Sequence, residues 1–283
     1  PDAQEDELVT KDGVQLGVTY YPSTEKKGAT PIIVIPDYKD SRAAYRSLAR
    51  QLQNPKGDDV ESFAVLTVDL RGHGDSTKQR MRDGSTQELD AAKLRKHDFE
   101  NMVKFDMAAI RGFLVGKNDE QKINLNELTI IGAGLGASVG AIWAAVDWAY
   151  PPLAVGKQGQ DVKALVMVSP RWKSHGLLMQ HALREPGVQR QVAMMMIFGA
   201  DDSRTRADVL RIKKQVERYH PEPKSSTDKP SDLAGLGVPN TRLAGGELLS
   251  QLDPVAVDRI AGFIQLHVAD EDHPWIQRRD RIQ

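Results

Sequence analysis

The sequence has 283 residues, of which 40% are hydrophobic and 27% charged. Lys and Arg (38) nearly balance Asp and Glu (39), so a formal net charge of -1 leaves no positive excess for nucleic acid. The chain has no cysteine, which excludes thiol nucleophiles, disulfides and thiolate metal sites, and it leaves seven histidines for acid–base chemistry. No apolar run reaches the roughly 18 residues that a membrane span needs.

Residues 1–283 are predicted to form one domain, because this length fits a single large α/β protein and no linker composition divides the chain. The core is expected over about residues 8–268. Residues 269–283 carry charges of both signs, so we expect a solvated tail with Trp275 packed on the domain. The chain begins at Pro1 without a Met, so we expect a cut N-terminus, and the composition suits a cytoplasmic or an exported protein.

The first predicted element is an antiparallel edge hairpin over residues 8–21, whose two β-prone arms flank Asp12-Gly13. Five apolar runs follow, each with a loop signal behind it: residues 31–36, 63–68, 128–131, 164–168 and 192–198. Continuous apolar runs without alternation are typical of strands that are covered on both faces. The sequence therefore predicts an α/β protein with a mostly parallel, doubly wound sheet of about eight strands.

Helices are predicted where apolar residues recur at three- and four-residue steps: residues 41–53, 99–115, 137–149 and 255–268. Ser41 stands where a side chain often caps the first of these helices. Residues 220–240 contain four prolines and several Ser, Gly and Lys residues, and they predict a long surface loop without regular structure.

Catalytic and binding groups of an open parallel sheet gather in the loops after the carboxyl ends of the strands. Those loops read Pro-Asp-Tyr-Lys-Asp-Ser from residue 36, Asp-Leu-Arg-Gly-His-Gly-Asp-Ser from 69, Gly-Ala-Gly-Leu-Gly-Ala-Ser from 132, and Gly-Ala-Asp-Asp-Ser from 199. Their order and spacing over residues 8–268 resemble the α/β-hydrolases, the fold of serine esterases, lipases and related peptidases. The most specific part is the stretch 68–76. Residues 169–191 are too few for a large cap, so we expect a minimal cap or none.

The resemblance implies a nucleophile in a sharp strand-to-helix turn, G-x-S-x-G. Here that turn is Gly132-Ala133-Gly134-Leu135-Gly136, and Gly134 stands where the serine should be. Glycine has no side chain, which closes the covalent acyl-enzyme route at this position. Ser138 lies one helical turn later and is not expected to replace the missing serine.

The other two members of the family's triad give a mixed result. Asp202 stands in the acid position, although we favour a second interpretation in which it caps a helix that starts near Arg204. The histidine is expected in residues 241–249, where Gly245 and Gly246 occur and no histidine does. His73 belongs to the turn motif, and the other histidines lie far from this position without a metal-binding spacing. No metal or cofactor is therefore expected.

The loop after the first parallel strand departs from the family too. The family usually has His-Gly there, where a backbone N–H helps to build the oxyanion hole, and this chain has Pro36-Asp37. Proline has no N–H, and an aspartate repels a developing oxyanion. Asp37 is expected to bind a cation or a ligand amine or, in the favoured interpretation, to cap the helix that begins near Ser41.

Three hypotheses follow for function. The first is a catalytically inactive α/β-hydrolase-fold protein that binds a small ligand or a protein partner. Its candidate binding residues are Asp37, Tyr38, Gly134, Leu135 and Asp202, and the glycine elbow is expected to leave a helix N-terminus open for a carboxylate or another small anion. The second is an ester or amide hydrolase that uses Asp37, Asp202 or His73 with a water or a metal.

The third hypothesis is a nucleotide-binding protein, because the turn from Gly132 to Ala137 also fits G-x-G-x-x-A between a strand and a helix. In that class an acidic residue normally ends the next strand. Here the next strand ends Val168-Ser169-Pro170. The glycines are equally explained by the close packing of an elbow turn.

Overall fold

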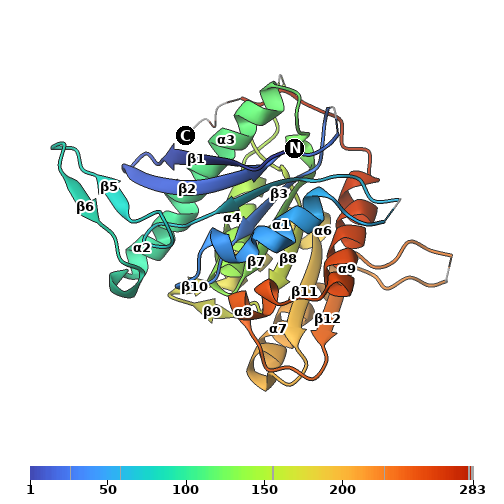
Figure 1. The fold of residues 1–283 in the computed structure, drawn as a ribbon. Coiled ribbons are helices and arrows are strands. Elements are labelled where there is room, and N and C mark those ends of the chain that lie inside the picture. The colour runs from blue at the N-terminus through green and yellow to red at the C-terminus, as the bar shows by residue number, and fades with distance from the viewer. Residues whose placement is uncertain (26, 58, 155, 226, 280, 282–283) are drawn as a thin grey trace.

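The structure is a computed structural model that describes residues 1–25, 27–57, 59–154, 156–225, 227–279 and 281. A ten-stranded sheet runs through the molecule in the order β12-β11-β8-β7-β3-β4-β2-β5-β6, with β1 paired to β2 (Figure 1). Its strands are β1 Gln4–Val9, β2 Val14–Tyr21, β3 Pro31–Ile35, β4 Ala64–Val68, β5 Lys78–Arg80, β6 Thr86–Glu88, β7 Leu128–Ala133, β8 Val162–Val168, β11 Ala193–Gly199 and β12 Leu233–Val238.

All five apolar runs are strands of the parallel part of the sheet, as the sequence predicts. Successive side chains along a strand enter opposite cores: Ile33 and Ile35 pack on one face, and Ile32 and Val34 on the other. Both faces are buried under helices, which explains why these strands are apolar throughout. The predicted hairpin is β1 and β2, and β2 joins the parallel part by antiparallel pairing with β4.

Helices cover both faces of the sheet (Figure 1). They are α1 Arg46–Gln53, α2 Lys96–Asn101, α3 Met107–Asp119, α4 Leu135–Trp148, α5 Met179–Leu183, α6 Pro186–Gln191, α7 Ser203–Val216, α8 Gly245–Ser250 and α9 Pro254–Ile264. A 3-10 turn, Arg42–Tyr45, precedes α1. Ser41 makes no side-chain cap there; the N–H of Arg42 instead donates to Asp69 Oδ1 at 2.7 Å.

The sheet is wider than predicted because three of its strands were not expected. Strands β5 and β6 form a hairpin that pairs with β2, and β12 lies inside the stretch 220–240, where we predicted a loop. β12 contains Gly235 and Gly237 and buries one side chain in full, so its sequence lacks the β-branched apolar character of an inner strand. Pairing with β11 at the sheet edge, and not intrinsic propensity, makes it a strand.

The C-terminal segment is docked on the domain through two arginines, a contact that the predicted solvated tail did not include, while most of its other described residues are exposed as expected. The side chain of Arg278 is fully buried and pairs with Asp161 at 2.9 Å, and Arg281 pairs with Asp147. Trp275 attaches this segment, as expected, by donating its Nε1–H to the carbonyl of Asn118 at 3.1 Å. Charged side chains near the end of this chain thus neutralise carboxylates that the domain has buried.

Between β8 and β11 the chain forms a small hairpin and two short helices, the minimal cap that the sequence predicts. The hairpin strands are β9 Lys173–Ser174 and β10 Leu177–Leu178, followed by α5 and α6. Within the described ranges, the structure has no helix that is both long and apolar enough to cross a membrane.

Candidate functional site

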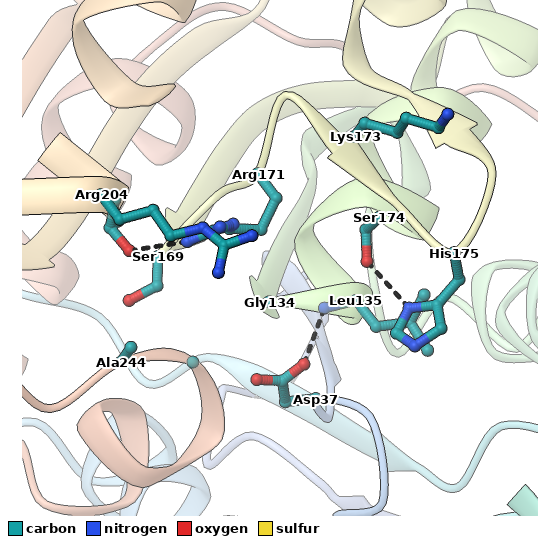
Figure 2. Close-up of a pocket in the computed structure, with 12 residues that line it drawn as sticks. Asp37, Gly134, Leu135, Ser169, Arg171, Lys173, Ser174, His175, Arg204 and Ala244 are labelled. Carbon is teal, nitrogen blue, oxygen red and sulfur yellow. Dashed lines mark hydrogen bonds between the residues drawn. The ribbon is translucent and has the colours of Figure 1, made fainter. Parts of the chain in front are cut away.

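A pocket of about 350 Å³ lies at the carboxyl ends of the parallel strands (Figure 2). Its lining comes from the loop after β3, the turn between β7 and α4, the segment from β8 to β9, and the first residues of α7 and α8. Segments far apart in sequence meet here because every parallel strand ends at this edge. This is where the loop-by-loop interpretation of the sequence expects a site.

The turn between β7 and α4 keeps the backbone of a nucleophile elbow. Gly134 has φ +46° and ψ -104°, a conformation that residues with a Cβ rarely adopt. The two flanking glycines allow the turn to be sharp: a Cβ on Gly132 would lie 2.5 Å from the backbone of Gly136, and a Cβ on Gly136 would lie 2.3 Å from the carbonyl oxygen of Ile35. The turn is therefore as sharp as the sequence predicts, and Gly134 at its apex has no side chain.

The carboxylate of Asp37 occupies the space beside this elbow. Its Oδ1 accepts the N–H of Leu135 at 2.8 Å and that of Tyr38 at 2.7 Å, and its Oδ2 accepts the N–H of Gly246 at 3.3 Å. Two sequence predictions are therefore wrong. The N-terminus of α4 is not open, because a side chain of the same protein fills it, and Asp37 caps α4 and α8 rather than the helix near Ser41.

Asp37 lies against Gly134 and Gly245, the glycines that the resemblance puts at the nucleophile position and near the histidine position. A Cβ on Gly134 would stand 2.1 Å from Asp37 Oδ1, and a Cβ on Gly245 would stand 1.8 Å from Asp37 Oδ2. At the neighbouring Gly246, a Cβ would come within 2.2 Å of Asp40 Oδ2. The absence of a side chain at Gly134 and at Gly245 thus leaves the space that the Asp37 carboxylate occupies.

Asp202 caps a helix, which confirms the favoured interpretation. Its Oδ1 accepts the N–H of Thr205 at 3.1 Å at the start of α7, and its Oδ2 accepts the hydroxyl of the same threonine. Partial burial raises the pKa of Asp202, but these hydrogen bonds and the charge of Arg171 outweigh it and hold the pKa below its ordinary value.

His73 and Tyr38, two further residues named from the sequence, are not among the residues that line the pocket. His73 is 4% exposed and its Nδ1 is 2.9 Å from the carbonyl oxygen of Arg71, so it supports the turn as predicted. Burial lowers the pKa of His73, which keeps the ring neutral at pH 7. The hydroxyl of Tyr38 donates to the carbonyl of Ala91, and its ring lies 4.4 Å from that of His175.

The sequence interpretation missed the residues of the segment after β8. Ser169, Arg171, Lys173, Ser174 and His175 all line the pocket, and Arg204 joins them from α7 (Figure 2). These residues could have been found from the sequence. Binding groups gather in the loops after parallel strands, and the loop after Val168 is one of these loops.

His175 lies beside the elbow, although it is 41 residues from Gly134 in sequence and seemed remote. It sits in the turn of the β9–β10 hairpin with φ +48°, and its ring stacks on Phe99 at 4.5 Å. Its Nδ1 is 3.0 Å from Ser174 Oγ. Partial burial lowers its pKa. Among the residues that the structure describes, no group of three or more His, Asp or Glu side chains is arranged to hold a metal.

Comparisons with known proteins agree with this architecture. A dienelactone hydrolase from Anabaena variabilis is 15% identical with a TM-score of 0.60, covering 95% of this chain and 99% of that one. An esterase from Pyrococcus furiosus is 14% identical with a TM-score of 0.59, covering 93% and 92%. An alpha/beta hydrolase from a Penicillium species is 13% identical with a TM-score of 0.59, covering 95% and 100%.

No family model and no curated protein sequence matches the chain. At these identities the solved structures establish the fold alone. The chain has the α/β-hydrolase fold, with a mostly parallel open sheet and helices on both faces.

Proposed function

We propose that this protein is a non-hydrolytic member of the α/β-hydrolase fold that binds a small ligand in the pocket above Gly134. The observation that carries the proposal is the hydrogen bond from the N–H of Leu135 to the carboxylate of Asp37. In an elbow of this type, the N–H after the nucleophile stabilises the oxyanion of the reaction. Here that N–H already serves a negative charge, which would repel a second one.

The missing groups would cost too much for residual triad catalysis. By the resemblance, Gly134 takes the nucleophile position and Gly245 lies near the histidine position; a Cβ at either would meet Asp37. In a measured Ser/His/Asp enzyme, loss of the serine or the histidine alone lowers kcat by about 10⁶-fold. Binding requires none of these groups, and a pocket of about 350 Å³ is within the range of small-molecule sites.

The first test is hydrolysis of p-nitrophenyl acetate and butyrate by the full chain. We expect release of p-nitrophenol at the buffer rate. We expect the same of Gly134→Ser, because its Cβ would collide with Asp37. Turnover by the unchanged protein above buffer would overturn the proposal.

The second test is a thermal-shift screen of small fragments, repeated with Ala244→Trp. Ala244 lines the pocket, so an indole there should fill it. Fragments that raise Tm of the unchanged protein should lose their effect in this variant, provided that its circular dichroism spectrum is unaltered. Fragments that act equally on both proteins bind elsewhere and would count against the pocket.

One observation favours hydrolysis as a second candidate. Ser174 Oγ and His175 Nδ1 are 3.0 Å apart in the lining of the pocket, and the lowered pKa of His175 leaves it neutral and able to accept a proton. Esterase turnover that disappears in Ser174→Ala and persists in Ser138→Ala would establish this candidate instead. Ser138 is the matched control because it is a fully buried serine on α4.

The two earlier alternatives receive less support. The carboxylates of Asp37 and Asp202 are engaged as helix caps, and His73 is buried in its turn. For a dinucleotide, the N–H that would meet the pyrophosphate is the one that Asp37 accepts. Calorimetric titration with NAD, NADP and ATP is expected to give no heat of binding.

A further inference from the structure

One wall of the pocket is formed by the segment after β8 and the first turn of α7. In Figure 2 the guanidinium groups of Arg171 and Arg204 extend from these two elements toward the same region beside Ser169. Asp37 reaches the pocket from the loop after β3, below the elbow (Figure 2). The pocket thus has a cationic wall in addition to the carboxylate.

Ser169 is the least expected member of this wall. It is 2% exposed and lines the pocket, yet its Oγ has no hydrogen-bond partner among the residues that the structure describes. Buried hydroxyl groups almost always have a partner, because an unmade hydrogen bond costs the full desolvation of the group. Its backbone is held at φ +49°, a region that disfavours any residue with a Cβ. Outliers of this kind cluster at binding sites.

The charges of the lining favour an anion. The lining contains three cationic residues, Arg171, Lys173 and Arg204, although Lys173 extends away from the two arginines in Figure 2. It contains one carboxylate, that of Asp37, whose two oxygens already accept three backbone N–H groups. Arg171 is held in place, because its Nε lies 3.3 Å from Asp208 Oδ2 and its Nη1 lies 3.4 Å from Thr205 Oγ1. A guanidinium that is oriented in advance loses little freedom when it binds an oxyanion.

We propose that Ser169, Arg171 and Arg204 form an oxyanion subsite, which receives the carboxylate or phosphate group of the ligand. The hydroxyl of Ser169 donates one hydrogen bond, and the planar N–H groups of the two arginines match the oxygens of such a group. The inference rests on the proposed function, since it identifies the charged end of the molecule that the pocket binds.

The test compares benzoate, its uncharged analogue benzamide, and inorganic phosphate on the full chain by thermal shift and calorimetry. At a hundredfold excess over Kd, binding at one site raises Tm by about 5 °C in a protein of this size. We expect benzoate or phosphate to give such a shift and benzamide to give none. Benzoate and phosphate separate an organic acid from a phosphate-bearing ligand.

Variants locate the binding. Ser169→Ala is expected to raise the Kd for the anion about tenfold, because a hydrogen bond to a charged group is lost. Arg204→Gln is expected to weaken it at least as much. Arg206→Gln is the matched control, since Arg206 is an exposed arginine two residues further along α7. It should leave Kd unchanged.

Each remaining outcome overturns the inference. Equal shifts with benzoate and benzamide would remove the anion subsite while leaving a ligand pocket, and so the proposed function, in place. No shift with any of the three probes, or equal losses in Arg204→Gln and Arg206→Gln, would also reject the subsite. Failure of the proposed function has a separate signature, which is esterase turnover.

Discussion

Helix α4 meets a carboxylate at each end, and the two ends hold their carboxylates differently. At the N-terminus, Asp37 is bound by backbone N–H groups alone, with no cation at ion-pair distance in the described part of the chain. In the last turn, Asp147 accepts the N–H groups of Asp161 and Val162 and pairs with Arg281.

The helix dipole explains the difference. The N-terminus carries about half a positive charge, so it stabilises the carboxylate of Asp37 without help. Burial and the neighbouring charge of Asp161 raise the pKa of Asp147 to about 6. The C-terminus of the helix carries the opposite partial charge, so it gives this carboxylate no help. The arginines of the C-terminal segment offset the penalty of burial. We therefore expect the N–H groups around Asp37 to accept another anion once this side chain is removed, whereas Asp147 serves as the counter-charge of Arg281.

The largest expected effect is at the buried end. Asp161→Asn leaves the buried guanidinium of Arg278 without its counter-charge, and this is expected to lower the free energy of unfolding by about 3–5 kcal/mol. Urea unfolding measures the loss. Asp208→Asn is the control, because its pair with Arg171 is 24% exposed on both sides and is worth at most about 1 kcal/mol. Equal losses in the two variants would contradict the distinction.

Glu127 shows a third arrangement, in which a buried carboxyl group is stabilised neither by the N-terminus of a long helix nor by an arginine. The hydroxyl of Thr30 lies 2.6 Å from Glu61 Oε1 and 2.7 Å from Glu127 Oε2, and one hydroxyl has one proton to donate. The second contact therefore needs a protonated carboxyl. Burial raises the pKa of Glu127 to about 7, from an ordinary value of 4.5.

This arrangement predicts a pH effect of about 3 kcal/mol. Between pH 4.5 and 7 the folded state binds the Glu127 proton more tightly than the unfolded state, so stability from this group is present at low pH and is lost as pH rises through 7. Unfolding of Glu127→Gln should lack this component, making the variant the more stable protein at pH 8. Parallel pH profiles of the two proteins would reject the shared proton.

At the N-terminus of α4, Asp37→Ala is expected to lower the free energy of unfolding by about 2 kcal/mol, because the N–H groups of Leu135 and Gly246 lose their acceptor. If those N–H groups form an exchangeable anion site, acetate should raise Tm of this variant more than that of the unchanged protein. Thermal unfolding in acetate and in chloride at equal ionic strength makes the comparison. Equal acetate shifts would show that the N–H groups do not exchange anions.

The smallest effect is expected for Asp202→Ala, at about 1 kcal/mol, the usual value of an N-cap. Asp202 is partly open to solvent, so water replaces the lost acceptor and acetate should bring no recovery. If Asp202→Ala and Asp37→Ala lower the free energy of unfolding equally in the same urea measurements, the predicted difference between the two caps is wrong.

Most of the fold could be predicted because the inner strands are apolar on both faces, as residues 31–35 and 164–168 illustrate. β12 was not predicted, because an edge strand with two glycines forms only by pairing with its neighbour, and its own sequence does not indicate that pairing. The docking of the C-terminal segment was not predicted for a related reason. A charged tail is expected to be solvated unless the buried carboxylates with which it pairs are known.

The site could be predicted in part. Gly134, Asp37 and Asp202 follow strands, and their positions could be inferred from spacing. The direction of the Asp37 carboxylate could not, because it depends on N–H groups from α4 and α8, 98 and 209 residues away. The unpartnered hydroxyl of Ser169 likewise becomes visible only when its surroundings are known.

The contacts of Asp37 with the positions of Gly134 and Gly245 also bear on how this chain can change over generations. A Cβ at position 134 or at position 245 meets the same carboxylate, so a side chain at either position requires Asp37 to shift. Replacing Asp37 first strips two helix ends of their cap and brings no nucleophile. A triad at these positions would therefore require an intermediate that has lost the Asp37 cap and has gained no nucleophile.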